Sequence, residues 1–323
     1  MKLQTTIKLS ALSLILALIL SMPMFTLVSC GKTDDLPTDS QDTTEAPETT
    51  EAPTTETETE TEALIGADVD PLLAKIAQKM ADSESYLIFS IGDSLTEGQG
   101  ASSIDFDYTA MFAKKLGEKF PEKNILRIDG KRNNDTQSVR YPSVPTQVQV
   151  IEGATSKITV VRSGFGGHTV KKITARSHDF INKKIKGETG DLFIICSGIN
   201  DSAMGNKEKY AIPPKYKQQL SDLVDMIYAA HPEADVILMT PTYVGQDGSS
   251  LRMHVNAMKA LAEERQIALI DLNKLWMDHW IKGSENYGQR EWLKEGDSCH
   301  PTDIGHEAIA DEMIRALFGV KPN

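Results

Sequence analysis

The sequence predicts an α/β domain built on a mainly parallel sheet. Beyond residue 63, short apolar runs alternate with stretches of helical periodicity, a pattern typical of strand–helix–strand units. Each apolar run is continuous, as expected of strands that are buried on both faces. Hydrophobic residues make up 40% and charged residues 25% of the 323 residues. This is close to the globular average and argues against a disordered chain or a multi-span membrane protein.

Five strands are predicted, with helices between them. The strands cover residues 87–91, 158–161, 192–196, 236–239 and 268–270. The clearest helix begins after Pro213 and Pro214 and places apolar side chains on one face: Tyr216, Leu220, Leu223, Val224, Ile227 and Tyr228. A last helix is expected over 306–317, with Gly319 as its stop signal. These elements form one domain, residues 66–323, within the size range of single domains.

Two stretches do not fit this alternation. Residues 129–157 are polar and contain two prolines, and residues 273–302 contain all three tryptophans, Trp276, Trp280 and Trp292. Long insertions in compact domains are often functional loops. Aromatic rings offer large apolar faces, so these tryptophans are expected either to stack on sugar rings or to pack the domain.

Residues 1–29 resemble the signal peptide of a lipoprotein. Lys2 and Lys8 precede an apolar run over residues 11–25, which is short for a membrane span of ~20 residues. The Leu-Val-Ser-Cys-Gly segment that follows resembles the bacterial lipobox, in which cleavage leaves Cys30 as a lipid-bearing N-terminus. The sequence therefore predicts an anchor on the outer face of the bacterial cytoplasmic membrane. An ordinary secreted protein with an incidental cysteine is the alternative.

Residues 30–65 are predicted to be a disordered linker. Thr, Glu, Asp and Pro dominate it, and almost nothing is apolar. Eleven acidic residues oppose Lys32 there, so most of the net charge of −12 lies in this segment and the domain carries −4. A near-neutral domain without basic runs is not expected to bind nucleic acid. The linker would span ~30 Å on average as a spacer, and an acidic binding tail is the alternative.

Residues that can carry chemistry follow four of the predicted elements. In chain order, the segments are Gly92-Asp93-Ser94-Leu95, Ser163-Gly164-Phe165-Gly166-Gly167, Ser197-Gly198-Ile199-Asn200-Asp201 and Asp297-Ser298-Cys299-His300-Pro301. Ligands bind at the carboxyl ends of the strands in an open parallel sheet. A hydroxyl, glycine-rich backbone amides, a carboxamide and an imidazole with a carboxylate three residues before it are the components of acyl transfer.

Ser94, His300 and Asp297 are the candidate catalytic residues. A serine hydroxyl needs a base, and a histidine held in one tautomer by a carboxylate is the usual one. The three-residue spacing lets one turn carry both the acid and the imidazole. The developing oxyanion needs preorganised donors, and the backbone amides of Ser94 and Gly167 with the side chain of Asn200 are the candidates.

These four segments are similar to the motif blocks of the SGNH (GDSL) hydrolase family. Ser94, Gly167, Asn200 and His300 match the four signature positions, and Asp297 matches the acid of an Asp-x-x-His motif. The similarity runs from about residue 86 to 318. It implies a three-layer α/β/α sandwich of the flavodoxin-like SGNH hydrolase type, ester or thioester hydrolysis through an acyl-enzyme, and no cofactor.

Several points stay open at this stage. Arg162 stands where many family members have Asn, so Gly164 and Gly166 remain alternatives to Gly167 as the oxyanion glycine. His306 is a rival base, although its position at the start of the last helix favours a structural role. The remaining histidines are expected at the surface or in packing: His168, His178, His231, His254 and His279.

Metal and redox chemistry find little support in the sequence. No close cluster of His, Cys and Asp has metal-ligand spacing, so no metal site is predicted. Cys196 and Cys299 both fall at the catalytic edge, and the sequence leaves open whether they form a disulfide. The Gly-x-Ser-x-Gly elbow of α/β-hydrolases is absent around Ser94, which disfavours that fold.

The sequence thus predicts a surface-tethered serine esterase that removes short acyl groups, acetyl above all, from a polysaccharide. A lysophospholipase or short-chain lipase is the alternative within the enzyme class. A non-catalytic carbohydrate-binding lipoprotein on the same fold is the alternative from another class. The complete set of candidate catalytic residues argues against the non-catalytic alternative, since an idle enzyme is free to lose any of them.

Overall fold

The structure is a computed structural model that describes most of the folded domain. Described residues are 64–133, 135–136, 138–242, 249–282, 289–294, 297 and 299–319. The predicted signal peptide, Cys30 and nearly all of the predicted linker lie outside them. Leu64 and Ile65, the last two residues of that linker, are partly buried against the core. No helix in the described part is long and apolar enough to span a bilayer.

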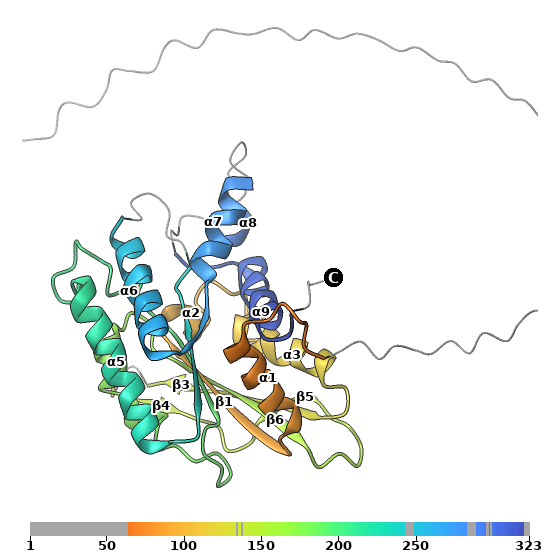
Figure 1. Ribbon diagram of the computed structural model, residues 1–323. Helices are drawn as coiled ribbons and strands as arrows, with labels where there is room; N and C mark the ends of the chain where they lie inside the picture. Colours follow the sequence, from red (N-terminus) through yellow and green to blue (C-terminus); the bar gives the residue numbers. More distant parts are fainter. Residues whose placement is uncertain are drawn as a thin grey trace, which may run out of the picture. The chain divides into compact units, whose positions relative to one another are not determined.

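A seven-stranded sheet forms the middle of the domain (Figure 1). Its order is β5-β2-β6-β1-β7-β8-β9, and β5 alone runs antiparallel to its neighbour. The strands are β1 (Ser85–Gly92), β2 (Asn124–Asp129), β5 (Thr146–Gln149), β6 (Lys157–Gly164), β7 (Leu192–Cys196), β8 (Asp235–Met239) and β9 (Ala268–Ile270). The five predicted strands are all present and parallel.

The prediction of five strands was two short, because β2 and β5 are more polar than buried strands usually are. In β2, Arg127 and Asp129 are buried as an ion pair, with Nε 3.0 Å from Oδ2. The edge strand β5 has the sequence Thr-Gln-Val-Gln and is exposed to half-buried. Both strands lie at one side of the sheet, where polar residues are tolerated by pairing or by solvent.

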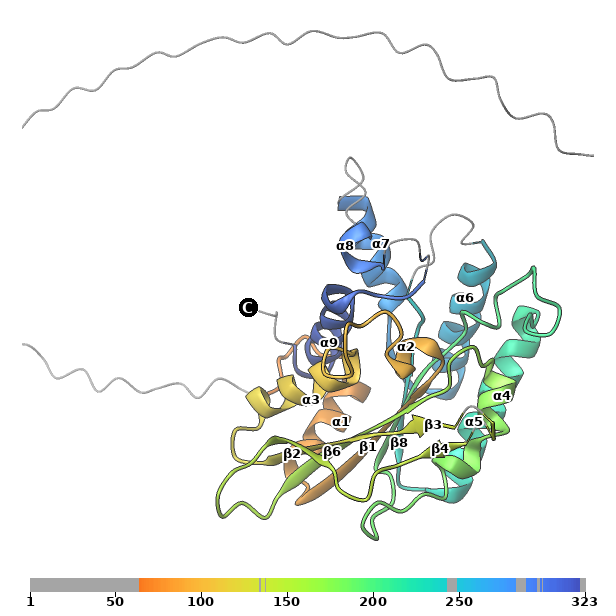
Figure 2. The same ribbon diagram turned by 180° about the vertical axis from the view of Figure 1, so that it is seen from behind.

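Helices cover both faces of the sheet, which confirms the three-layer α/β/α sandwich (Figures 1 and 2). One face packs against α1 (Pro71–Asp82), α3 (Tyr108–Lys119) and α9 (Asp303–Phe318). The other packs against α4 (Val170–Thr174), α5 (Pro213–Ala230) and α6 (Ser249–Arg265). A hydrophobic core lies on each face of the sheet, and the side chains of β1 alternate between the two. Ile88 packs in the core on the first face, and its neighbours Leu87 and Phe89 pack in the core on the second.

Local signals set the helix ends. Helix α5 begins at the predicted Pro213-Pro214 pair and buries the predicted apolar face. Helix α9 begins three residues before the prediction because Thr302 caps it, its hydroxyl accepting from the Gly305 amide at 3.3 Å. It ends at the predicted Gly319, which has φ +73°.

The two insertions contain short elements. The first holds the hairpin of β3 (Lys131–Arg132) and β4 (Val139–Arg140) together with β5. The second holds α7 (Leu272–Lys282) and α8 (Gln289–Trp292). Trp276 is fully buried, and Trp292 packs edge-on against it with ring centroids 4.8 Å apart. Trp276 and Trp292 thus pack against each other, and for the buried Trp276 the structure decides between the two alternatives in favour of packing. The side chain of Trp280 lies outside the described residues.

Candidate active site

The central strands β6, β1 and β7 end level with one another. Gly164, Gly92 and Cys196 are in register across the three strands. The chain leaves β1 toward β2 on one side of the sheet and leaves β7 toward β8 on the other. Such a switch point is where open α/β sheets bind ligands. The segments that follow these three strands carry the candidate serine, glycine and asparagine.

Ser94 begins the short helix α2 (Ser94–Glu97) directly after β1. Asp93 caps this helix, because its Oδ1 accepts from the Leu95 amide at 3.1 Å. Gly92 permits the sharp turn, since a Cβ there would lie 2.2 Å from the Cys196 carbonyl oxygen. The serine hydroxyl is thereby held at the strand end, with the side chain 6% exposed.

A tight loop carries His300 and Asp297 to the same place. An antiparallel bridge joins Leu293 to Pro301, and the Lys294 amide donates to the His300 carbonyl at 3.0 Å. Asp297 closes the turn, because its Oδ1 accepts from the backbone amides of Cys299 at 2.9 Å and His300 at 3.2 Å. The carboxylate is thus oriented by the backbone of the residues it serves.

The three predicted catalytic residues form one hydrogen-bonded chain. His300 Nδ1 donates to Asp297 Oδ2 at 2.5 Å. Because this bond places the proton on Nδ1, Nε2 is free to accept, and the Ser94 hydroxyl donates to it at 2.9 Å. Residues separated by 206 positions in the sequence are therefore in direct contact.

The charge of Asp297 suits this arrangement. Partial burial alone would raise the pKa of this carboxyl, but hydrogen bonds from the Cys299 amide and from the side chain and amide of His300 outweigh it and lower the pKa to about 2. Asp297 is therefore ionised at neutral pH, and an ionised carboxylate stabilises an adjacent imidazolium.

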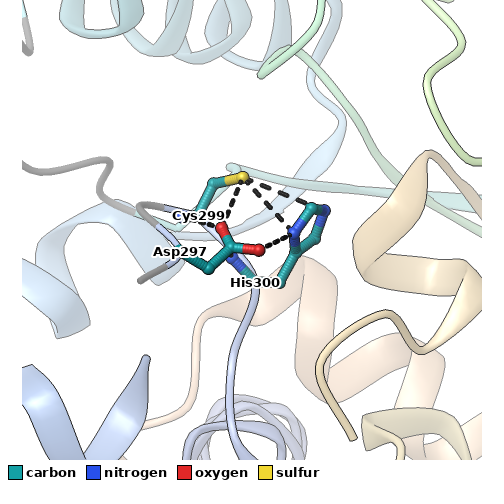
Figure 3. Close-up of side chains that lie close together, drawn as sticks. All are labelled: Asp297, Cys299 and His300. Carbon is teal, nitrogen blue, oxygen red and sulfur yellow. Dashed lines mark hydrogen bonds and ion pairs between the residues drawn. The ribbon is translucent and has the colours of Figure 1, made fainter. Parts of the chain in front are cut away.

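Cys299 lies against this pair, as Figure 3 shows. Its Sγ is 3.4 Å from Asp297 Oδ1 and 3.7 Å from His300 Nδ1. Potential metal-ligating atoms of the three side chains lie within 4.8 Å of one another, so the group could also hold a metal ion. The sequence spacing does not indicate such a site. In the structure Asp297 and His300 are hydrogen-bonded to each other. Cys299 and the buried Cys196 are both free thiols, so the disulfide left open above is not formed.

Three hydrogen-bond donors converge beside Ser94. The backbone amides of Ser94 and Gly167 have no acceptor in the described part of the chain. The side-chain Nδ2 of Asn200 is buried and has no acceptor within 3.5 Å there, although Asn200 lies near enough to Asp93 that its amide helps to lower the pKa of that carboxyl. Asn200 Oδ1 accepts from Lys209 Nζ at 2.9 Å. Unpaired buried donors are uncommon in folded proteins. Asn200 Nδ2 is one of several in the described part of the chain, and it belongs to a residue predicted for the oxyanion hole.

The three candidate glycines differ in what surrounds them. A Cβ at Gly164 would lie 2.2 Å from the Glu97 amide nitrogen, and one at Gly166 would lie 2.0 Å from Glu97 Oε2, so both glycines pack under α2. A Cβ at Gly167 would meet only Lys209 Nζ, at 3.6 Å, although its φ of +74° favours glycine. Gly167 is thus the glycine that faces open space.

Arg162 has a structural position below the site. Its guanidinium NH1 donates to the Glu97 carbonyl at 2.7 Å and lies 3.0 Å from Asp107 Oδ2. Nε lies 3.4 Å from Asp129 Oδ1. The arginine that departs from the family pattern therefore ties the end of α2 to β2 and to the cap of α3, away from the three donors.

His306 is placed away from the serine. It is fully buried, its Nδ1 accepts from the Tyr108 amide at 3.3 Å, and its Nε2 donates to the Gln99 carbonyl at 3.3 Å. Burial lowers its pKa, which favours the neutral ring that these two contacts require.

Lys209 is the one residue of this edge that the sequence did not suggest. It belongs to no motif and lies nine positions after Asn200 on the loop that follows β7. A lysine in a polar loop gives no signal, because only the return of the loop brings it to the site.

Comparison with known proteins identifies the family. The model of the GDSL-like lipase/acylhydrolase family matches residues 90–308, more than half of the chain. No curated protein matches. Among solved structures, an acetyl xylan esterase aligns at 18% identity and a TM-score of 0.52, over 72% of this chain and 99% of that one.

Two further structures are similar at comparable identity. A two-domain esterase active on acetylated mannans aligns at 18% identity with a TM-score of 0.54, over 79% of this chain and 55% of that one. A peptidoglycan O-acetylesterase aligns at 15% identity with a TM-score of 0.53, over 79% and 97%. These likenesses concern the fold, and the family match adds the class of reaction. The chain therefore belongs to the GDSL-like lipase/acylhydrolase family and is a carboxylic ester hydrolase with the SGNH hydrolase fold.

Proposed function

We propose that the protein is a serine esterase that removes acetyl groups from a polysaccharide through an acyl-enzyme on Ser94. The observation that carries the proposal is the hydrogen-bonded chain from Ser94 through His300 to Asp297, with distances of 2.9 Å and 2.5 Å. His300 Nε2 takes the hydroxyl proton as Ser94 Oγ attacks the ester carbonyl carbon. Asp297 stabilises the imidazolium that results.

The tetrahedral intermediate carries its negative charge on the former carbonyl oxygen. We assign its stabilisation to the amides of Ser94 and Gly167 and to Asn200 Nδ2, the donors that lack acceptors among the described residues. His300 then gives its proton to the sugar oxygen, the C–O bond breaks and the alcohol leaves. In the second half, His300 takes a proton from water, the hydroxide attacks the acyl carbon, and the proton returns to Ser94 as acetate departs.

Acetyl on a polysaccharide is the substrate class that the comparisons support. Three similar structures are enzymes for acetylated xylan, acetylated mannan and peptidoglycan O-acetyl groups. The predicted linker adds a second argument. A long, charge-extended spacer carries an active site away from the membrane surface where a lysophospholipase meets its substrate.

One observation favours a longer acyl chain as the second candidate. Ile104 and Phe106 are 47% and 46% exposed on the loop after Gly100. Gly100 itself packs against the backbone of His300, since a Cβ there would lie 3.1 Å from the His300 carbonyl carbon. Exposed apolar side chains near the catalytic loop suit an acyl tail.

The test compares the two candidates directly. Turnover of p-nitrophenyl acetate, p-nitrophenyl octanoate and lysophosphatidylcholine should decrease in that order, and acetate should be released from an acetylated polysaccharide panel. Ser94→Ala is the control for background hydrolysis. Faster turnover of either long-chain substrate would contradict the assignment as a carbohydrate esterase and favour the lipase.

We also propose that Cys30 carries a lipid anchor on the outer face of the cytoplasmic membrane. The lipobox-like segment supports this, and the acidic linker offers no apolar surface for a second attachment. Cys30→Ala should release the protein from the membrane fraction or leave an unprocessed precursor, whereas Thr33→Ala should change neither. Membrane retention of a processed Cys30→Ala protein would contradict the proposal.

A further inference from the structure

Lys209 contacts the side chain of Asn200, and hydrogen bonds within the loop between them bring the two residues together. The Ala211 amide donates to the Asp201 carbonyl at 3.0 Å, which brings the two ends of the loop together. Asn206 Oδ1 accepts from the amides of Glu208 at 3.0 Å and Lys209 at 3.3 Å. The half-buried Lys209 therefore returns to the start of the loop, where Nζ donates to Asn200 Oδ1 at 2.9 Å.

This contact decides which way the carboxamide of Asn200 faces. A carboxamide has a donor end and an acceptor end of nearly the same shape, and a lysine ammonium can only donate. Lys209 therefore pairs with Oδ1 and leaves Nδ2 for the opposite side. That Nδ2 is buried and has no acceptor within 3.5 Å among the described residues; Asp93, whose pKa the Asn200 amide helps to lower, is the neighbouring carboxyl. Without the ammonium, either end of the side chain could face the substrate.

The charge of Lys209 also reaches the reacting centre. Among the described residues, its Nζ is the only atom within 4 Å of where a Cβ on Gly167 would stand, at 3.6 Å, so it lies beside the second candidate oxyanion donor as well. No described carboxylate forms an ion pair with it. Burial raises the pKa of Asp93 to about 6, and the positive charge of Lys209 is among the influences that oppose the rise. A positive charge beside the donors favours a developing oxyanion.

We propose that Lys209 is a positioning residue of the oxyanion hole, which fixes the amide of Asn200 toward the substrate and adds positive potential to the site. The inference rests on the proposed function, because it takes Asn200 as an oxyanion donor. Lys209 would stabilise the transition state, where the negative charge develops, so its loss should lower kcat more than it raises KM. A lysine that bound an anionic group of the substrate would act on KM.

The experiment is a double-mutant cycle on p-nitrophenyl acetate, which carries no anionic group for Lys209 to bind. Asn200→Ala should lower kcat by ~10²-fold to ~10³-fold. Lys209→Met should lower kcat by ~10-fold to ~10²-fold, the range of a lost hydrogen bond to a charged group, with KM changed less than threefold. Lys207→Met is the matched control, since Lys207 is an exposed lysine of the same loop, and it should keep wild-type kcat.

Two further variants separate positioning from folding. Lys209→Arg keeps a positive donor and should recover most of the kcat that Lys209→Met loses. In the Asn200→Ala background, Lys209→Met should lower kcat by a smaller factor than in wild type, because the group that it positions is gone and only the effect of its charge is left. Thermal unfolding of each variant checks that the fold is kept.

The outcomes are distinct. If Asn200→Ala leaves kcat unchanged, the assignment of the oxyanion hole fails. If Asn200→Ala lowers kcat but Lys209→Met matches the Lys207→Met control, the inference about Lys209 alone is overturned. A change in KM without a change in kcat, or fully additive losses in the double variant, would also overturn it.

Discussion

His300 and His306 stand six residues apart and have the same side chain, but the loop of the first and the helix of the second place them in opposite settings. The His300 side chain is 21% exposed and lies between a carboxylate and a hydroxyl. His306 is fully buried in the first turn of α9 and lies between a backbone amide and a backbone carbonyl. Both rings have two hydrogen bonds, so the number of bonds does not distinguish them.

The partners distinguish the two histidines. Asp297 stabilises a positive charge on His300, and Ser94 offers a proton that His300 can take. At His306 the partners are the backbone amide of Tyr108 and the backbone carbonyl of Gln99. Neither carries a negative charge that would stabilise an imidazolium, and neither offers a hydroxyl proton for the ring to take. A base is therefore recognised by a carboxylate on one nitrogen and a titratable or nucleophilic group on the other. Burial and hydrogen bonding alone indicate a structural histidine.

The largest expected effect is on kcat, which alanine substitution of His300 should lower far more than alanine substitution of His306. His300→Ala and Ser94→Ala should each lower kcat by ~10⁵-fold to ~10⁶-fold, and the double variant should be scarcely worse, because the residues act as a unit. His306→Ala should keep kcat within ~10-fold of wild type. Steady-state kinetics on p-nitrophenyl acetate measures all four proteins. Equal losses for His306→Ala and His300→Ala would make His306 the base.

Asp297→Asn should have the next largest effect. The amide keeps the shape of the side chain but cannot accept from His300 Nδ1 with a full charge, and it favours the wrong tautomer of the ring. A loss in kcat of ~10⁴-fold is expected, with circular dichroism unchanged. Asp303→Asn, a change to an acid of α9 that lies on the His306 side, is the matched control. A loss of less than tenfold for Asp297→Asn would remove the acid from the mechanism.

His306→Ala should instead lower the free energy of unfolding, by about 2–4 kcal/mol. The change leaves a cavity and two buried backbone groups without partners. His306→Gln can both donate and accept and should lose less. Urea denaturation measures the difference. Equal stability of His306→Ala and wild type would show that the ring does not join α3 and α9.

The pH dependence of stability should differ for His306 and Asp297. Burial lowers the pKa of His306, so the unfolded chain binds its proton first and stability falls as the pH drops below ~6.5. The pKa of Asp297 is lowered to about 2, so its contribution is present above ~4 and is lost as the pH falls from ~4 toward 2. Relative to wild type, His306→Gln should flatten the first decline and Asp297→Asn the second. Unfolding midpoints measured across the pH range give the result, and a wild-type slope below pH 6.5 in His306→Gln would contradict it.

The sequence predicted the parts of the molecule that repeat a local pattern. The five continuous apolar strands and the helix after Pro213 and Pro214 are present. They could be predicted because neighbouring residues alone reveal an apolar run or a helical periodicity. Strand β2 escaped prediction because Arg127 and Asp129 neutralise each other within the core. Arg127 also pairs with Asp105, and Asp129 with Arg162, and no run of neighbouring residues reveals these more distant partners.

The same distinction holds for the site. Ser94 could be named because it lies in a short motif at the end of β1, and Asp297 and His300 because they share a short motif before the last helix. Lys209 could not, because its contact with Asn200 depends on how a loop closes. The sequence also left open whether Trp276 stacks on a sugar or packs the domain, and the structure buries it. Spacing alone does not reveal which face of a helix is covered.

The nucleophile itself is the central claim, and covalent labelling tests it most directly. A fluorophosphonate probe should add to wild-type protein at one site, and peptide mass spectrometry should place the adduct on Ser94. Labelling should be absent in Ser94→Ala and strongly slowed in His300→Ala, while His306→Ala should label at nearly the wild-type rate. An adduct on another residue, or equal labelling of wild type and Ser94→Ala, would contradict the account.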